Sequence, residues 1–178
     1  VWECAACTLR FTQDIPAPSS IGRYYHSDDY ISHTDTEKGM INRLYHLVRK
    51  RTLQNKKEIV IRYSHQHTGR LLDIGAGTGT FAGIMNEGGW QVTALEPDAT
   101  ARAIAEKKYN LALQDTASLF TIPPGSLDVI TLWHVLEHVH TLHQYFGQFK
   151  KIVKKGGILL IAVPNYTSAD AEKYGPCW

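Results

Sequence analysis

Apolar residues recur along this chain with two different spacings. Between residues 36 and 51 they return every three or four positions, as at Leu44 and Val48, and a similar stretch covers residues 56–63. This spacing predicts two helical segments, the first of which ends in basic residues, as a helix C-terminus favours. Residues 1–35 are rich in Pro, Gly, Ser, Asp and His, which predicts irregular structure.

After residue 70 short continuous apolar runs alternate with helical stretches. The runs predict strands at residues 70–74, 91–95, 111–114, 127–133 and 158–163. Helices are expected between them at residues 79–87, 98–109 and 142–153, with Gly156 closing the last one. Strands that alternate with helices predict right-handed crossovers and a parallel sheet, so the expected fold class is α/β. Ligands bind such sheets at the carboxyl ends of the strands.

A glycine-rich turn follows the first predicted strand. Gly75, Gly77 and Gly79 alternate directly after the apolar run, and Glu96 ends the next strand. Glycine lets the backbone approach a ligand closely, and the N-terminus of the following helix offers unpaired N–H groups. A carboxylate one strand away can accept hydrogen bonds from both hydroxyls of a ribose. The unit therefore predicts a site for a nucleoside cofactor.

The residue after the turn bears on which cofactor binds. The dinucleotide fingerprint requires a glycine where this chain has Thr80, which disfavours a nicotinamide cofactor. The stretch around the turn resembles instead the first motif of class I S-adenosylmethionine-dependent methyltransferases, of the small-molecule type. The resemblance continues in order along the chain, and its five segments are residues 71–81, 92–98, 113–115, 127–139 and 154–165.

The resemblance implies a Rossmann-like sheet of strand order 3-2-1-4-5 with helices on both faces and an N-terminal lid. We expect an N-terminal segment, residues 1–69, and a cofactor-binding domain, residues 70–178. Sheets of this family add two strands beyond the fifth, here residues 158–163, which would otherwise form an exposed apolar edge. We therefore expect that the domain is C-terminally truncated, or that another chain covers this edge.

The resemblance also implies which residues bind S-adenosylmethionine. Asp73 would orient the ammonium end, the glycines would make room for the methionine and ribose portions, and Glu96 would bind the ribose hydroxyls. Asp115 and its neighbouring backbone would contact adenine, and the backbone near Trp133 and His134 would line the methionine pocket. The expected set is Asp73, Gly75, Ala76, Gly77, Thr78, Gly79, Glu96, Pro97, Asp115, Thr116, Trp133 and His134.

Two of these residues have further interpretations. Asp115 is also typical of a helix or turn cap. His134 can be a general base or a structural residue. Together with Glu137 and His138 it forms the zinc-peptidase pattern H-x-x-E-H. Zinc binding requires both histidines on one helical face, whereas His134 follows a predicted strand, so we expect no metal at this motif.

The N-terminal segment carries two more candidates. Cys4 and Cys7 have the spacing of half a zinc knuckle, and the resemblance implies that relatives complete it with a preceding Cys pair. Because a zinc site needs four ligands, we expect a metal-free pair in this chain. The resemblance also implies a lid over the cofactor, although the same aromatic residues could instead cover the first helix. The expected lid residues are Tyr24, Tyr25, Tyr30 and His33.

Composition narrows the class of protein. Of the 178 residues, 43% are hydrophobic and 20% are charged, as in globular proteins. A formal net charge of +2 is too small to indicate nucleic-acid binding, and no apolar run reaches the roughly 18 residues that a membrane span needs. Three cysteines form no disulfide framework and no signal-peptide pattern is seen, so we expect a cytoplasmic protein.

The function that we expect is methyl transfer from S-adenosylmethionine to a small-molecule acceptor by in-line displacement. A base such as His134 is needed only if the acceptor is a hydroxyl or a protonated amine. Two alternatives stay open at this point: an NAD-dependent oxidoreductase on a similar sheet, and a methyltransferase-like module that binds cofactor or a partner without turnover.

Overall fold

The computed structural model describes residues 2–11, 13–17, 20 and 40–175. The chain divides into two units, Val1–Lys38 and Gly39–Trp178, and each is described by itself. In the smaller unit, β1 (Trp2–Glu3) pairs antiparallel with β2 (Arg10–Phe11) and forms a hairpin. The other elements that the described residues form belong to the larger unit.

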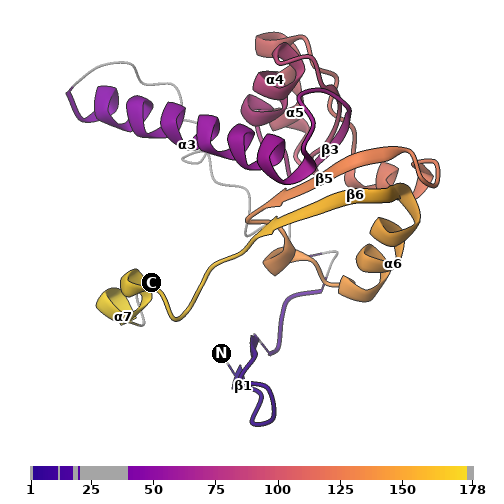
Figure 1. Cartoon of the computed structure of the whole chain (residues 1–178). Coiled ribbons are helices and arrows are strands. Elements are labelled where there is room, and N and C mark those ends of the chain that lie inside the picture. The colour runs from indigo at the N-terminus through magenta and orange to yellow at the C-terminus, as the bar shows by residue number, and fades with distance from the viewer. Residues whose placement is uncertain (1, 12, 18–19, 21–39, 176–178) are drawn as a thin grey trace. The chain divides into compact units, whose positions relative to one another are not determined.

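A four-stranded parallel sheet forms the centre of the larger unit (Figure 1). Its strands are β3 (Arg70–Ile74), β4 (Gln91–Leu95), β5 (Leu127–Trp133) and β6 (Val153–Ala162). They follow the order β4-β3-β5-β6, and one bridge between Leu95 and Gln114 adds a further segment beside β4. This is the expected order 3-2-1-4-5, so the prediction of a Rossmann-like α/β fold is confirmed.

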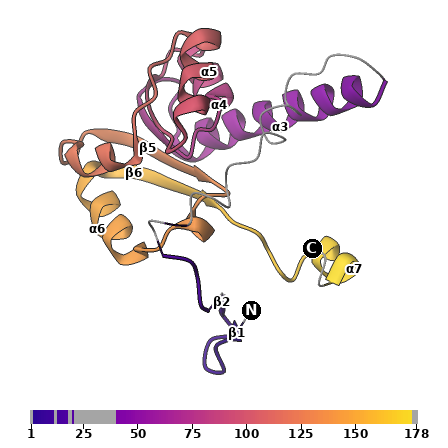
Figure 2. The same cartoon turned by 180° about the vertical axis from the view of Figure 1, so that it is seen from behind.

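Helices cover both faces of this sheet (Figures 1 and 2). On one side lie α3 (Met40–Ser64), α4 (Thr80–Glu87) and α5 (Ala99–Tyr109), and on the other lies α6 (Leu142–Ile152). The shorter elements are η2 (Thr116–Thr121), η3 (Leu136–His138) and α7 (Ala169–Tyr174). Within the described residues, every helix is too short or too polar to cross a membrane.

The sheet separates two hydrophobic cores. The core toward α6 comprises Leu72, Ile74, Leu95, Leu119, Leu127, Ile130, Leu132, Phe149 and Ile152. The core toward α3 and α4 comprises Val60, Leu71, Phe81, Met85, Trp90 and Val129. Alternate residues of β3 and β5 enter opposite cores, so both strands are mainly apolar on both faces, which is why apolar runs predicted them.

The helix before the sheet differs from its prediction. Residues 40–64 form one continuous helix, α3, rather than two helical segments. The residues between the two apolar stretches, such as Arg51 and Gln54, are exposed on this helix, while Leu53 packs against the core. The polar interruption is therefore the solvent side of one amphipathic helix. The helix α3 lies in the same unit as the sheet, and the domain boundary between residues 69 and 70 stays a prediction.

Two further predictions of boundaries were wrong. The helix α6 ends at Ile152 and the chain passes directly into β6, whereas the sequence placed the helix end near Gly156. Pairing of Val153 with Leu127 on the neighbouring strand extends β6 toward its N-terminus, a contact that local periodicity does not contain. The strand expected at residues 111–114 is reduced to a single bridge.

Asp128 connects the amino ends of three strands. It lies on β5, where its Oδ2 accepts from the N–H of Arg70 on β3 at 2.8 Å, and its Oδ1 accepts from Nζ of Lys154 on β6 at 2.6 Å. Burial raises the pKa of Asp128, but the hydrogen bonds and charges of Lys154 and Arg70 outweigh burial and leave the pKa below its usual value. The stabilisation by this group is therefore present above the unfolded pKa and is lost as pH falls through the folded pKa.

We expect Asp128→Ala to lower the free energy of unfolding by about 1.5–3 kcal/mol at neutral pH, because hydrogen bonds to a charged group are lost. Urea denaturation should show that this loss begins to shrink as the pH falls below about 4, where the carboxyl group of the unfolded chain becomes protonated. As a control, removal of the exposed Glu87 side chain in Glu87→Ala should change stability by less than about 0.5 kcal/mol. A loss of equal size at pH 3 and pH 7 would contradict the role of charge.

Candidate active site

The glycine turn connects β3 to α4 and is anchored on the end of β4. The N–H groups of Gly75 and Ala76 both donate to the carbonyl oxygen of Leu95, at 2.8 and 3.0 Å. Gly75, Gly77 and Gly79 have φ values of 69°, 55° and 75°, in the left-handed region that favours glycine. The turn therefore lies at the carboxyl ends of the strands, where ligands bind this class of sheet.

The three glycines are needed for different reasons. A Cβ atom on Gly75 would overlap the side chain of Val135, and one on Gly79 would lie 2.7 Å from Cβ of Ala105. Neighbouring side chains therefore leave no room for a side chain at Gly75 or Gly79. A Cβ atom on Gly77 would meet no other atom within 4 Å. The backbone at Gly77 borders open space, so a ligand can approach it.

Glu96 joins the two turns that follow β3 and β4. Its Oε2 accepts from the N–H of Gly77 at 2.7 Å, and its Oε1 accepts from the N–H of Asp98 at 3.1 Å. The residue is only 9% exposed. The Arg102 guanidinium donates to the carbonyl oxygens of Glu96 and Pro97, at 2.6 and 2.7 Å. The carboxylate and the loop that carries it are thus held by hydrogen bonds on both sides.

Asp73 is buried at the end of β3. It is 2% exposed, and the Thr131 hydroxyl donates to its Oδ1 at 2.7 Å. Burial raises the pKa of Asp73 to about 7, the Thr131 hydrogen bond and the positive charge of Lys56 oppose this rise, and the charge of Glu96 adds to it. The carboxyl group therefore titrates near neutral pH, and a cation bound beside it would favour the charged form.

Asp115 caps η2, which was the second of its two interpretations. Its Oδ1 accepts from the N–H of Ala117 at 2.9 Å, and its Oδ2 lies 3.7 Å from Nη1 of Arg102. The side chain is half-exposed and faces the same arginine that binds the loop of Glu96. Thr116 begins the short helix that Asp115 caps. Adenine contact by these two residues stays a prediction.

Trp133 and His134 lie at the carboxyl end of β5. His134 has a φ of 59°, which is uncommon for a residue other than glycine, and its N–H donates to the carbonyl oxygen of Ala162 at 2.8 Å. Its side chain is 62% exposed, with Nδ1 3.9 Å from Oε1 of Glu137. Glu137 and His138 belong to η3, a single turn. Because His134 is not on a helix, H-x-x-E-H does not form the geometry of a zinc peptidase.

Sequence reasoning missed two basic side chains of α3 that reach this region. Arg49 donates from Nη2 to the Thr80 hydroxyl at 3.0 Å, and the Tyr109 hydroxyl donates to the same oxygen at 3.3 Å. The Nζ atom of Lys56 lies 4.8 Å from the centre of the Trp133 ring. Basic residues occur along the whole of α3, so no spacing in the sequence distinguished these two.

The N-terminal candidates belong to other parts of the chain. The expected lid residues, Tyr24, Tyr25, Tyr30 and His33, lie outside the described residues. Cys4 and Cys7 belong to the connection between β1 and β2, and neither forms a disulfide. The N–H of Cys4 donates to the carbonyl oxygen of Leu9 at 2.9 Å and closes the hairpin. The lid and the zinc ribbon stay predictions.

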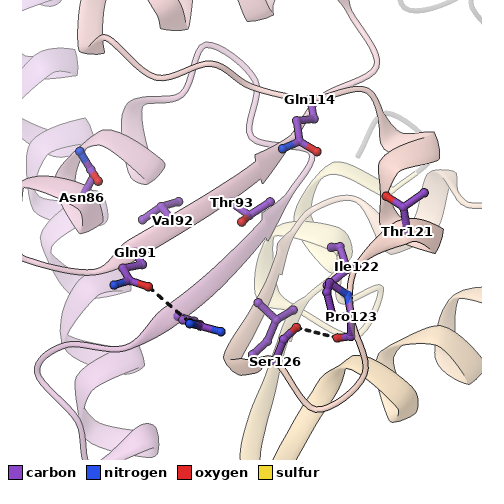
Figure 3. A pocket seen from close by; sticks show the side chains of 11 residues that line it. Asn86, Gln91, Val92, Thr93, Gln114, Thr121, Ile122, Pro123 and Ser126 are labelled. Carbon is purple, nitrogen blue, oxygen red and sulfur yellow. Dashed lines mark hydrogen bonds between the residues drawn. The ribbon is translucent and has the colours of Figure 1, made fainter.

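A cavity of about 560 Å³ lies along β4 (Figure 3). Its lining begins at the first residues of three strands, Arg70, Gln91 and Leu127, and extends to Gln114, whose carbonyl oxygen accepts from the N–H of Glu96. The Nε atom of Arg70 donates to Oε1 of Gln91 at 3.3 Å across part of this lining. Glu96 and His134 do not contribute to the cavity.

The sequence of the larger unit is similar to that of known proteins. Residues 43–178 match the family described as methyltransferase domain. A ubiquinone biosynthesis O-methyltransferase of Rhodopseudomonas palustris (strain BisB5) is 31% identical over 101 residues, which cover 54% of this chain and 40% of that protein. This chain thus spans about two fifths of the length of the curated relatives that it matches.

Solved structures share the fold of the larger unit. A SAM dependent methyltransferase from Archaeoglobus fulgidus has a TM-score of 0.57 at 24% identity, over 72% of this chain and 62% of that one. Phospholethanolamine N-methyltransferase 2 from Haemonchus contortus has a TM-score of 0.53 at 25% identity, over 67% of this chain and 31% of that one. Its structure contains S-adenosylhomocysteine and phosphomonomethylethanolamine.

Two alanine substitutions should separate the roles of the glycines. We expect Gly75→Ala to lower the free energy of unfolding by about 2–5 kcal/mol, because the left-handed backbone and the overlap with Val135 both contribute. Gly77→Ala meets open space and should lose only about 1–2 kcal/mol from its backbone conformation. Urea denaturation of both variants measures the difference. Equal losses would contradict the assignment of Gly77 to an open position.

Proposed function

The chain belongs to the methyltransferase domain family, and from this membership we propose that it transfers a methyl group from S-adenosylmethionine to a small-molecule acceptor. The observation that carries the proposal is the contact between the Glu96 carboxylate and the Gly77 N–H, made where the backbone borders open space. A carboxylate and a glycine backbone in contact are the combination that a ribose and its neighbouring groups require.

Several described residues support the assignment of this cofactor. Open space at Gly77 allows close approach to the backbone, and the two oxygens of Glu96 can accept from the two ribose hydroxyls. The buried Asp73 carboxyl is suited to the ammonium group of the methionine end, because a cation favours its charged form. We assign Asp115 to the adenine side of the cofactor, and its Oδ2 lies 3.7 Å from Nη1 of the arginine that binds the Glu96 loop.

When bound, S-adenosylmethionine supplies the activated methyl group, so the protein contributes mainly by orientation. Correct alignment of two reacting groups can contribute on the order of 7–11 kcal/mol. Arg102 and the Asp98 N–H hold Glu96 from one side, and the glycine turn holds it from the other. These contacts fix the position of the ribose before the acceptor arrives.

A hydroxyl acceptor would give His134 a role as general base. The relative from Rhodopseudomonas palustris is named an O-methyltransferase, which favours oxygen as the acceptor atom for this chain. A hydroxyl must lose its proton during transfer, and histidine is the side chain whose usual pKa suits that task. His134 is exposed at the carboxyl end of β5, and Oε1 of Glu137 lies 3.9 Å from its Nδ1.

Binding of S-adenosylhomocysteine, measured by calorimetric titration, tests the cofactor site. The wild type should bind it saturably, and Glu96→Ala should weaken binding by about 1.5–3 kcal/mol, because the hydrogen bonds of the ribose to a charged group are lost. Glu106→Ala removes an exposed acid on α5 and should leave the affinity unchanged.

NAD titrated in parallel separates the competing cofactors. Binding of NAD and not of S-adenosylhomocysteine would overturn the proposal. Unchanged affinity in Glu96→Ala would remove Glu96 from the ribose site while leaving the cofactor assignment intact. Because Glu96 also accepts from the backbone of Gly77 and Asp98, circular dichroism should first show that the variant is folded.

His134→Asn tests the proposed base. Asparagine tolerates a left-handed backbone, so the φ of 59° can be kept while the basic ring is lost. We expect affinity for S-adenosylhomocysteine to stay within about twofold, and methylation of catechol, used as a probe hydroxyl acceptor, to slow by about 10²–10⁴-fold. Undiminished transfer would exclude His134 as the base, and a collapse of cofactor affinity would show that its role is structural.

A further inference from the structure

Lys56 occupies a position of α3 that helix packing would assign to an apolar residue. It lies about one helical turn from both Leu53 and Val60, and these two side chains pack in the core between α3 and the sheet. Its ammonium lies over the indole ring of Trp133, 4.8 Å from the ring centre. Burial lowers the pKa of Lys56, while the negative charge of Asp73 opposes this change. Burying a charge is costly, so its neighbours must compensate.

Lys56 is connected to Asp73 through two residues of β5, Trp133 and Thr131. Thr131, two residues before Trp133, is the register partner of Asp73 and donates to its Oδ1 at 2.7 Å. Alternate residues of a strand face the same side of the sheet, so Asp73, Thr131 and Trp133 all face α3. Phe81 of α4 packs edge-on against Trp133, with 5.6 Å between ring centres. Lys56, Trp133, Thr131 and Asp73 therefore form one cluster beside the glycine turn.

The charges that act on Asp73 have opposite signs. Lys56 from α3 favours the ionised carboxylate, and Glu96 at the end of β4 disfavours it. The neighbours from β5 and α4 in this cluster, Thr131, Trp133 and Phe81, carry no charge. A carboxyl whose pKa is about 7 is only partly ionised at neutral pH. Loss of the positive charge of Lys56 would raise this pKa further and leave Asp73 largely protonated.

We propose that Lys56 is a positioning residue of the cofactor site: its ammonium keeps the Asp73 carboxylate charged, and Asp73 can then bind the α-ammonium group of the cofactor. This inference rests on the proposed function, in which Asp73 receives the methionine end of S-adenosylmethionine. Lys56 acts through Asp73 rather than on the reacting atoms. A protonated Asp73 would lose the charge-assisted hydrogen bond that a carboxylate makes with an ammonium group.

The test is the pH dependence of S-adenosylhomocysteine binding, measured by calorimetric titration between pH 6 and 8.5. In the wild type the affinity should increase as Asp73 ionises and level off above its pKa of about 7. Lys56→Met should move the midpoint of this increase upward by about one pH unit or more. The affinity of the variant should then be about fivefold lower at pH 7 and should nearly recover by pH 8.5.

Lys57→Met is the matched control, because it removes the same charge from the next residue of α3. The side chain of Lys57 extends toward Gly88 at the C-terminus of α4. A Cβ atom added to Gly88 would lie 2.9 Å from the Nζ atom of Lys57. Its pH profile should coincide with that of the wild type. Lys56→Arg keeps the positive charge and should keep the wild-type midpoint.

An unchanged midpoint in Lys56→Met would overturn the proposal. A loss of affinity of equal size at every pH would also overturn it, because that result indicates a structural role. In an Asp73→Asn background, Lys56→Met should have no pH-dependent effect, and a persistent effect would show that Lys56 does not act through Asp73.

The failure of this inference is distinguishable from the failure of the proposed function. If the wild type does not bind S-adenosylhomocysteine at any pH, the proposed function fails. The pH dependence of binding can then no longer be used to test Lys56. A carbon-13 NMR titration of the Asp73 carboxyl in the ligand-free protein then tests Lys56 alone. A higher pKa in Lys56→Met than in Lys57→Met supports the charge coupling, and equal pKa values overturn it.

Discussion

The site depends on one hydrogen bond, from the Gly77 N–H to the carboxylate of Glu96. It connects the turn after β3 with the end of β4, two strands that pair in register along their whole length. Gly77 has open space where a side chain would be, so the backbone that binds Glu96 also borders space that a ligand can enter. Asp98 and Arg102 hold the other side of the loop. The carboxylate is therefore oriented before any ligand binds, which reduces the cost of ordering it.

The buried carboxyl group of Asp73 lowers the stability of the fold at neutral pH. Its folded pKa of about 7 lies above the usual value, so stabilisation from this group is present below about pH 4 and is lost as the pH rises through 7. An apolar residue at the end of β3 would avoid this cost. The hydroxyl of Thr131 and the charge of Lys56 reduce it without removing it. A buried acid that titrates near neutral pH is typical of a functional site rather than of a structural core.

Much of the fold was predictable because the sheet is buried on both faces. Strands β3 and β5 are mainly apolar on both faces, and a run of this kind is visible in the sequence without knowledge of its partners. The helix start at Asp98 was also predictable, because Asp98 caps α5 through a contact between residues three positions apart. The errors involve long-range contacts. The start of β6 at Val153 follows from pairing with Leu127 on another strand, and no local pattern contains that pairing.

The sequence by itself determined the order of the elements, the glycine turn and the acid at the end of the second strand, because each depends on residues close together in the chain. It also determined the resemblance to methyltransferases. Only the tertiary structure decided that Glu96 binds the Gly77 backbone, that Arg102 binds the loop of Glu96, and that the Lys56 ammonium lies over the Trp133 ring, where its charge acts on Asp73. The physical reason is that charge and burial act through space: a lysine of α3 looks the same in the sequence whether it faces water or a buried carboxylate.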